Sequence, residues 1–279
     1  MRADGKKLKN ADPMYKVAAH IMAKRSDAMN MITLDIPVEP MSKYLNEKRK
    51  EGKRYSHLSL IIAAYLQTVA QFPALNRFVV NKTIYARNEI AIGMVVLKGG
   101  KIDSMGTMSK LYLKPHYTLD DVQNTIDEYI EENREEDSKN STDKFIDAIL
   151  KIPGLLRVGI SLFKVLDKFG LLPKKIIDIS PFHISAVVTN LASIRTNHIY
   201  HHVYDFGTTS LALAMGNLRE VPKRVKGEIV FERCMPIGLV MDERIASGSY
   251  FALAFRKFSK LLENPELLET PSEVINQDI

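Results

Sequence analysis

Three of the seven histidines lie in one short segment, residues 198–207 (HIYHHVYDFG). An imidazole titrates close to neutral pH, so His201 and His202 are candidate general bases for proton transfer. His198 lies three residues before them, and Asp205 is the only acidic residue in the segment. A metal site needs three or four ligands at a regular spacing, which this segment lacks, so the sequence predicts no metal site.

The overall composition is that of a globular protein with one large domain or two small ones. The chain has 279 residues, of which 46% are hydrophobic and 26% charged. The single cysteine, Cys234, excludes internal disulfides and Cys-rich metal sites. The first residues contain no apolar core of a signal peptide, and no run approaches the ~18 apolar residues of a membrane span. We therefore expect a cytoplasmic protein.

The net charge of +6 arises in the first 54 residues, which hold 13 Lys and Arg against 7 Asp and Glu. These basic residues alternate with acidic ones, and no aromatic platform or known nucleic-acid motif accompanies them. The sequence therefore predicts no nucleic-acid partner.

Helical and strand patterns alternate along the chain without a repeat or a long linker, which predicts a single α+β domain over residues 1–279. Asp12 and Ser56 are predicted N-caps, and Gly52 a helix end. The predicted helices cover residues 12–26, 41–52, 57–72, 119–137 and 248–265, and the predicted strands residues 31–40, 77–80, 83–86, 89–97, 182–191, 209–218 and 228–242.

Three segments, 57–96, 184–193 (ISAVVTNLAS) and 235–268 (beginning MPIGLVMDERIASG), occur in an order and spacing that resemble a known family. They are similar to the catalytic domain of the dihydrolipoamide acyltransferases of 2-oxoacid dehydrogenase complexes and, more distantly, to chloramphenicol acetyltransferase. The resemblance implies a chloramphenicol-acetyltransferase-like two-layer fold, with a mixed, largely antiparallel sheet covered by helices. It also implies a homotrimer or a larger assembly of trimers, with each site in a channel between subunits. The implied substrate is an acyl thioester such as acyl-CoA, and no cofactor is bound covalently.

The family motif DHRxxDG is changed at two positions in this chain. Residues 242–248 read DERIASG, so Glu243 stands at the catalytic histidine and Ser247 at the supporting aspartate. Asp242, Arg244 and Gly248 keep the motif. A carboxylate is a weaker base than imidazole unless burial raises its pKa, so the resemblance implies an impaired base at Glu243. The alternative is that Glu243 only pairs with Arg244 or another cation.

Two other features bear on catalysis. Thr189 falls at the serine of the family's SNL segment, followed by Asn190, so the resemblance assigns its hydroxyl to the tetrahedral oxyanion. His201 or His202 could replace the missing histidine. However, Asp205 follows His202 by three positions, whereas the HHxxxDG motif of related enzymes requires four.

Residues 138–180 form a helical insertion outside the resemblance, and residues 266–279 an acidic tail that we expect to be solvated. Lysines interrupt the apolar faces of residues 145–179. That pattern is typical of an amphipathic hairpin on a membrane surface, but also of a helical pair packed over the sheet or across a subunit interface, which we favour.

The leading hypothesis is an acyltransferase-family protein that binds an acyl thioester, with weak or redirected catalysis. The alternative is an inactive trimeric scaffold or acyl-ligand-binding protein, and a third is a peripheral membrane protein that uses the 145–179 hairpin. The predicted opening helix and strand, residues 12–26 and 31–40, also fit the resemblance, which therefore begins near the N-terminus, so we expect neither a lipoyl nor a peripheral-subunit-binding domain.

Overall fold

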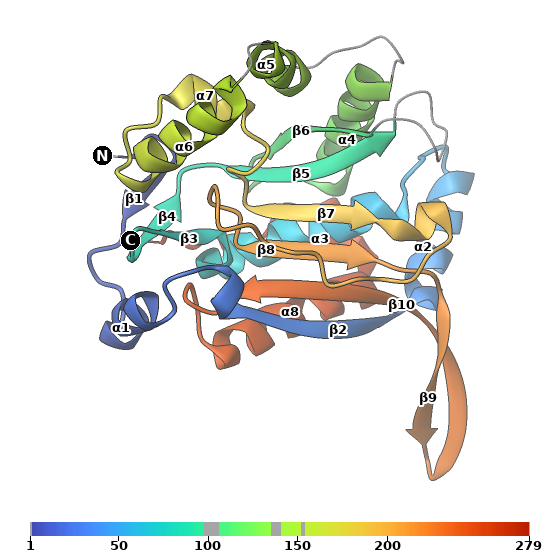
Figure 1. The fold of residues 1–279 in the computed structure, drawn as a ribbon. Helices are drawn as coiled ribbons and strands as arrows, with labels where there is room; N and C mark the ends of the chain where they lie inside the picture. Colours follow the sequence, from blue (N-terminus) through green and yellow to red (C-terminus); the bar gives the residue numbers. More distant parts are fainter. Residues whose placement is uncertain (1, 98–105, 135–140, 152–153, 279) are drawn as a thin grey trace.

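The computed structural model describes residues 2–97, 106–134, 141–151 and 154–278. A mixed sheet forms one layer, and α2, α3, α4 and α8 cover one of its faces (Figure 1). The strands are β1 (Gly5–Lys7), β2 (Met29–Pro37), β3 (Arg77–Val80), β4 (Thr83–Arg87), β5 (Ile90–Leu97), β6 (Gly106–Leu113), β7 (Ala186–Asn190), β8 (Leu211–Met215), β9 (Arg219–Val225) and β10 (Glu228–Asp242). The helices are α1 (Pro13–Ile21), α2 (Val38–Lys50), α3 (His57–Gln71), α4 (Leu119–Arg134), α5 (Ser141–Leu150), α6 (Leu155–Lys168), α7 (Lys174–Ile179) and α8 (Gly248–Glu263).

The order of strands in the large sheet is β2-β10-β8-β7-β5-β6, with β9 paired to the first half of β10. The pairs β5–β7 and β7–β8 are parallel, and the other pairs are antiparallel. A small sheet, β1-β4-β3, lies beside it. The predicted α+β class and two-layer fold with a mixed, largely antiparallel sheet are therefore confirmed.

The core lies between the sheet and α3, whose residues are buried on nearly every side. Ser56 caps α3 by accepting a hydrogen bond from Ser59 N at 3.0 Å, and Ser59 Oγ accepts one from Ser56 N. Asp12 caps α1 in the same way through Met14 N, at 2.7 Å. The caps predicted at these residues are thus confirmed.

Local sequence patterns missed three strands and misplaced two helix boundaries. Residues 38–40, predicted as the end of a strand, form the first turn of α2, because β2 ends at Pro37. β1 and β6 were not predicted, and β9 was not predicted because most of its residues are exposed and lack a buried face. α1 ends at Ile21, five residues before the predicted end, because the chain turns at Met22 into a separate short helix at Ser26–Ala28. The glycine pair Gly99–Gly100, whose sequence LKGGKID predicts a hairpin turn after the strand at 89–97, lies outside the described residues.

Most residues of the C-terminal tail are exposed, as we expected, but the tail is folded back onto the body of the molecule at a few points. It forms a short helix, Pro265–Glu269, in which Leu268 is buried. Asn276 N then donates to Ala70 O at 2.8 Å, and Asp278 pairs with Arg77 at 2.6 Å. The tail is ordered because it returns over the end of α3, where its polar groups find partners.

The insertion forms three helices rather than the predicted pair. α5 and α7 contact β6, while α6 lies outward against α5 and exposes most of its side chains. Among the described residues, no helix has the length and apolar character to cross a membrane.

Candidate active site

The turn that follows β10 is built around Asp242, which is wholly buried. Its carboxylate accepts from Arg244 Nε at 2.8 Å and from the other side of the guanidinium at 2.7 Å, in the paired geometry typical of strong arginine–carboxylate contacts. A second buried arginine, Arg25, lies 3.4 Å from the same carboxylate. Two cations therefore fix one anion at the start of the predicted motif.

Arg25 connects this turn to three other segments, and no sequence pattern predicted that role. Its guanidinium donates to the carbonyls of Tyr204, Val79 and Gly207, the last two at 3.2 Å. Burial lowers the pKa of Arg25, while the charge of Asp242 opposes that change. Its partners are up to 217 residues away in the chain, so no local pattern could have identified it.

Glu243 does not pair with Arg244, because Arg244 is committed to Asp242. The interpretation of Glu243 as half of that ion pair is therefore wrong. Its Oε2 instead accepts from Asn30 Nδ2 at 2.7 Å, and its backbone N–H donates to Ala28 O at 2.9 Å. Within the described residues Glu243 contacts no cation. It is a half-buried, oriented carboxylate at the end of β10 and β2.

Ser247 performs the task of a helix cap rather than supporting Glu243. Its Oγ accepts from Tyr250 N at 3.1 Å at the start of α8. Gly248 is the first residue of α8, and a Cβ added there would meet nothing within 4 Å. An aspartate at 247 could make the same cap, since Asp and Ser serve equally well there.

Thr189 lies at the opposite end of the sheet from Glu243. It is paired through Ala214 of β8 with Gly238 of β10, five residues before Glu243. Five residues of strand and two strand spacings place the two α-carbons roughly 20 Å apart. Thr189 and Glu243 of one chain therefore cannot act on the same carbonyl group.

Thr189 faces the side of the sheet away from the covering helices. The alternation along β7 puts Val188 in the core beneath α3 and Val187 on the other face, so Thr189 shares the face of Val187. Its neighbour Asn190 accepts from Ser193 N at 3.2 Å, which closes the turn after β7.

The histidine segment crosses that same face, but His201 and His202 meet neither Thr189 nor Glu243 in the hydrogen bonds of the described residues. His201 Nδ1 lies 3.0 Å from His202 O, and the His202 side chain is exposed. Asp205 accepts from the backbone N–H groups of Arg25 and Ser26, so it positions the chain. No group of three or more metal-ligating residues occurs in the described part of the chain.

His198, unlike His201 and His202, packs against the strands of the large sheet. Its Nε2 lies 3.0 Å from Thr33 Oγ1, and its ring passes over Gly238, where a Cβ would lie 3.1 Å from His198 Cδ2. Burial is the main cause that lowers the pKa of His198. A glycine inside a strand often marks a place where another segment comes close to the backbone. Gly238 was therefore the feature of the sequence that could have predicted the position of His198.

A second polar cluster fixes the insertion to the sheet. Arg2 donates to the Asp167 carboxylate of α6 at 2.6 Å, and His183 Nε2 lies 3.3 Å from that carboxylate. Burial alone would raise the pKa of Asp167, but His183 and Arg2 hold it below its ordinary value. His183 lies buried just before β7 as part of this cluster.

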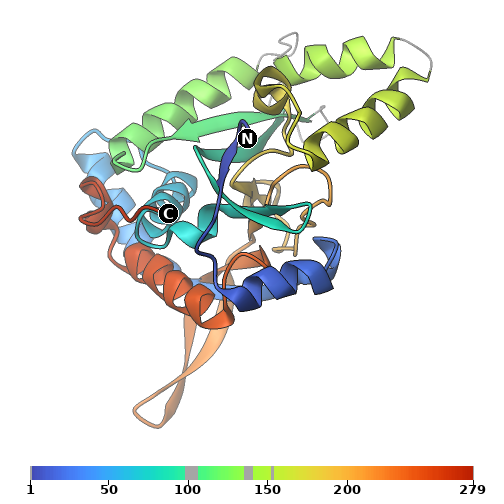
Figure 2. The same ribbon diagram turned by 90° about the vertical axis from the view of Figure 1, so that its left-hand side faces the viewer.

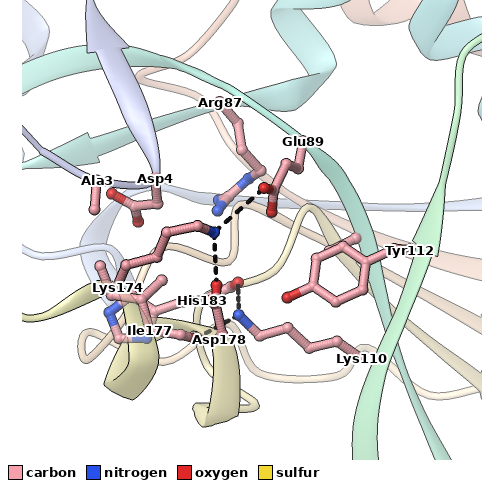
Figure 3. A pocket seen from close by; sticks show the side chains of 11 residues that line it. Ala3, Asp4, Arg87, Glu89, Lys110, Tyr112, Lys174, Ile177, Asp178 and His183 are labelled. Carbon is pink, nitrogen blue, oxygen red and sulfur yellow. Dashed lines mark hydrogen bonds and ion pairs between the residues drawn. The ribbon is translucent and has the colours of Figure 1, made fainter.

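Beside this cluster is a small cavity of about 20 Å³, room for about one water molecule (Figure 3). Lys110 of β6 reaches into it and donates to the carbonyls of Ile177, at 2.5 Å, and His183, at 2.8 Å. Lys174 of α7 lies 3.4 Å from Glu89 and 3.0 Å from Asp178. The cavity is too small for an acyl substrate, and its residues anchor α7 to β6.

The fold is similar to that of chloramphenicol acetyltransferase and of the dihydrolipoamide acetyltransferases. The chain is similar to a chloramphenicol acetyltransferase, with 10% identity over 92% of this chain and 99% of that chain and a TM-score of 0.59. It is also similar to a probable dihydrolipoamide acetyltransferase from Listeria monocytogenes, with 13% identity over 93% and 95% of the two chains and a TM-score of 0.58. For the cubic core of a pyruvate dehydrogenase multienzyme complex, the identity is 10%, the coverage 91% and 88%, and the TM-score 0.53.

Residues 187–270 match the family model for the 2-oxoacid dehydrogenases acyltransferase (catalytic domain). No curated protein sequence matches the chain. The resemblance predicted from the sequence is confirmed in two respects: the chain has a chloramphenicol-acetyltransferase-like fold, and residues 187–270 match this acyltransferase family.

The buried charge cluster makes the stability of the turn sensitive to Asp242. Asp242→Asn leaves Arg25 and Arg244 without a counter-ion, so we expect the free energy of unfolding to fall by about 3–5 kcal/mol. The matched control is Glu232→Gln, which breaks the exposed Lys223–Glu232 pair and should cost about 1 kcal/mol or less. Urea unfolding measures both. Equal small losses would mean that the cluster does not hold the turn.

Lys110 makes stability depend on pH in the alkaline range. Burial is the main cause that lowers the pKa of Lys110, to about 7, with the charge of Arg87 a smaller cause. In the unfolded chain its pKa is about 10.4, so between these values the unfolded state holds more protons and stability rises with pH. The increase is up to roughly 1.4 kcal/mol per pH unit.

Urea unfolding from about pH 7 to about pH 10 measures this increase in the native chain and in Lys110→Met. We expect the variant to lack the alkaline gain, whereas the exposed control Lys43→Met should keep it. Parallel profiles of the native chain and Lys110→Met would show that Lys110 has an ordinary pKa.

Proposed function

We propose that the protein transfers an acyl group from a thioester such as acyl-CoA to an acceptor thiol or hydroxyl, in a channel between two copies of the chain. The observation that carries this proposal is the state of Glu243. The buried cluster at Asp242 holds the turn, while Glu243 remains free of any cation among the described residues and is oriented by Asn30. A residue that only stabilised the turn would be expected to join the cluster.

In the proposed reaction, Glu243 of one copy accepts the proton of the acceptor group as its sulfur or oxygen attacks the thioester carbonyl. The Thr189 hydroxyl of the neighbouring copy donates to the tetrahedral oxyanion. The intermediate collapses, the carbon–sulfur bond breaks, and the proton on Glu243 passes to the leaving CoA thiolate. The products are the acylated acceptor and CoA.

Glutamate makes this reaction slower than histidine would. A carboxylate lies about 4 pKa units below a thiol, against about 2 for imidazole. The additional 2 units correspond to roughly 3 kcal/mol, or about 100-fold in rate. We therefore propose slow acyl transfer, at a site that two copies of the chain form together.

Assembly into a homotrimer, or a larger assembly of trimers, is the second part of the proposal. Thr189 and Glu243 lie at opposite ends of the sheet, so a site that uses both needs two copies. The ribbon of β9 and the first half of β10 projects from the body of the molecule (Figure 1). It exposes Ile229 and Phe231, which are 68% and 67% exposed, and a lone two-stranded ribbon is marginally stable in water. A neighbouring copy would cover these side chains.

Glu243 is tested by two variants, a single and a double substitution. Glu243→Gln keeps a hydrogen bond to Asn30 but cannot take a proton, so we expect thiol-dependent CoA release from acyl-CoA to fall by about 100-fold or to background. Glu243→His combined with Ser247→Asp restores the family motif and should raise the rate by up to about 100-fold over the native chain. Release of CoA is measured at several acceptor concentrations.

Equal rates for the native chain and Glu243→Gln would exclude Glu243 as the base. If acyl-CoA binding persisted in that case, by calorimetry, the alternative of an inactive scaffold or acyl-ligand-binding protein would be supported instead. No gain in the restored variant would mean that the acceptor side of the channel has changed.

The use of two copies per site is tested by mixing variants. Glu243→Gln and Thr189→Val should each be nearly inactive alone. When the two are co-expressed in equal amounts, about a quarter of the sites in random trimers combine an intact Glu243 with an intact Thr189. We therefore expect about a quarter of the native activity to return. Activity no greater than that of the separate variants would contradict a shared site.

A further inference from the structure

Seven exposed lysines line two adjoining cavities on one side of the molecule. They form no ion pair within the described part of the chain, and we call them the lysine belt: Lys7, Lys9, Lys16, Lys24, Lys82, Lys164 and Lys168. One cavity, of about 450 Å³, lies between α1 and β4, and the other, of about 460 Å³, lies between the β3–β4 turn and α6. Lys82 lines both, so the belt is continuous.

The acidic residues in these cavities do not neutralise the belt. Asp167 is held by Arg2 and His183, and Asp205 accepts from the backbone of Arg25 and Ser26. The positive charge of the belt is therefore available to an external anion.

Two helices border the belt and turn apolar side chains to solvent. In α1, Met14, Val17 and Ile21 follow one face and are 70%, 51% and 76% exposed. In α6, one face is formed by side chains that are 66%, 53%, 52% and 61% exposed, namely Val158, Leu162, Val165 and Phe169. Figure 2 shows α1 and α6 on the same side of the molecule, with the β3–β4 hairpin between them.

We propose that this side of the molecule binds the surface of a membrane that contains anionic lipids. The lysine belt would contact the phosphate headgroups, and the apolar faces of α1 and α6 would enter the boundary between headgroups and acyl chains. Two apolar stripes on either side of unpaired lysines fit such a surface. A nucleic-acid backbone would engage the lysines but give the apolar stripes no role, and a second copy related by a two-fold axis would oppose one lysine belt with another.

The proposal involves the insertion together with the basic N-terminal segment, since α6 comes from one and α1 from the other. It goes beyond the acyl-transfer proposal and does not depend on it. Arg25 and Arg244 also line the larger cavity, so the membrane would lie next to the turn that carries Glu243.

The test is co-sedimentation of the full chain with vesicles. The probes are phosphatidylcholine vesicles with and without about 30% phosphatidylglycerol, at low and high salt. We expect binding to the anionic vesicles alone, weakened by salt. Each lysine near such a surface contributes a factor of about five, so Lys164→Gln with Lys168→Gln should lower the partition coefficient about 25-fold. The control, Lys43→Gln with Lys50→Gln on α2, removes two exposed lysines outside the belt and should leave binding unchanged.

The apolar part is tested by Val165→Ser with Phe169→Ser, which are exposed and should not disturb folding. We expect weaker binding that high salt weakens further. Absence of binding to anionic vesicles, or equal binding to neutral ones, would overturn the proposal. So would a change in subunit number caused by these serine variants without any vesicle binding, which would assign the face to a contact between copies. Tighter binding of an RNA duplex than of vesicles, unaffected by the serine variants, would assign the lysine belt to nucleic acid.

Discussion

A carboxylate removed from water must be balanced by cations, and the balance at Asp242 organises one end of this molecule. Asp242 is the last residue of β10, and its two partners reach it from different parts of the chain. Arg244 also donates to Met22 O at the end of α1, at 3.0 Å, and Arg25 holds the carbonyls of β3 and of the segment before β8. Through its two arginines, one buried anion thus links the turn after β10 to the end of α1, to β3 and to the segment before β8.

This cluster also explains why the turn can keep its shape while its chemistry changes. The hydrogen bonds that fix the backbone come from Asp242 and from the cap at Ser247, and neither requires a particular side chain at position 243. Position 243 is therefore free to hold an imidazole or a carboxylate without loss of the turn. In the proposed reaction, a change from imidazole to carboxylate at this position would alter the rate of proton transfer and leave the turn as it is.

The sequence predicted best where the physical cause is local. Caps at Asp12 and Ser56, the end of α2 near Gly52 and the extent of β10 all follow from side chains within a few residues of the feature. Elements fixed by distant partners were missed. β9 exists because it pairs with β10, and the tail is ordered because Asp278 meets Arg77. For the candidate site, the two family motifs located Glu243 and Thr189. The distance between them and the role of Arg25 depend on the packing of β10 against β8 and β2, which no motif specifies.

The distribution of charge gains a different meaning once the chain is folded. The net charge of +6 comes from the first 54 residues. In the folded chain, most lysines of the first 24 residues lie on one side of the molecule. α1 and the residues on either side of it bring Lys7, Lys9, Lys16 and Lys24 beside the β3–β4 turn, and Arg2 holds the end of α6 there through Asp167. Lys164 and Lys168, more than 100 residues later, therefore extend the same positive surface. A segment that is only moderately basic in sequence becomes a concentrated lysine belt because one buried ion pair fixes where the insertion lies.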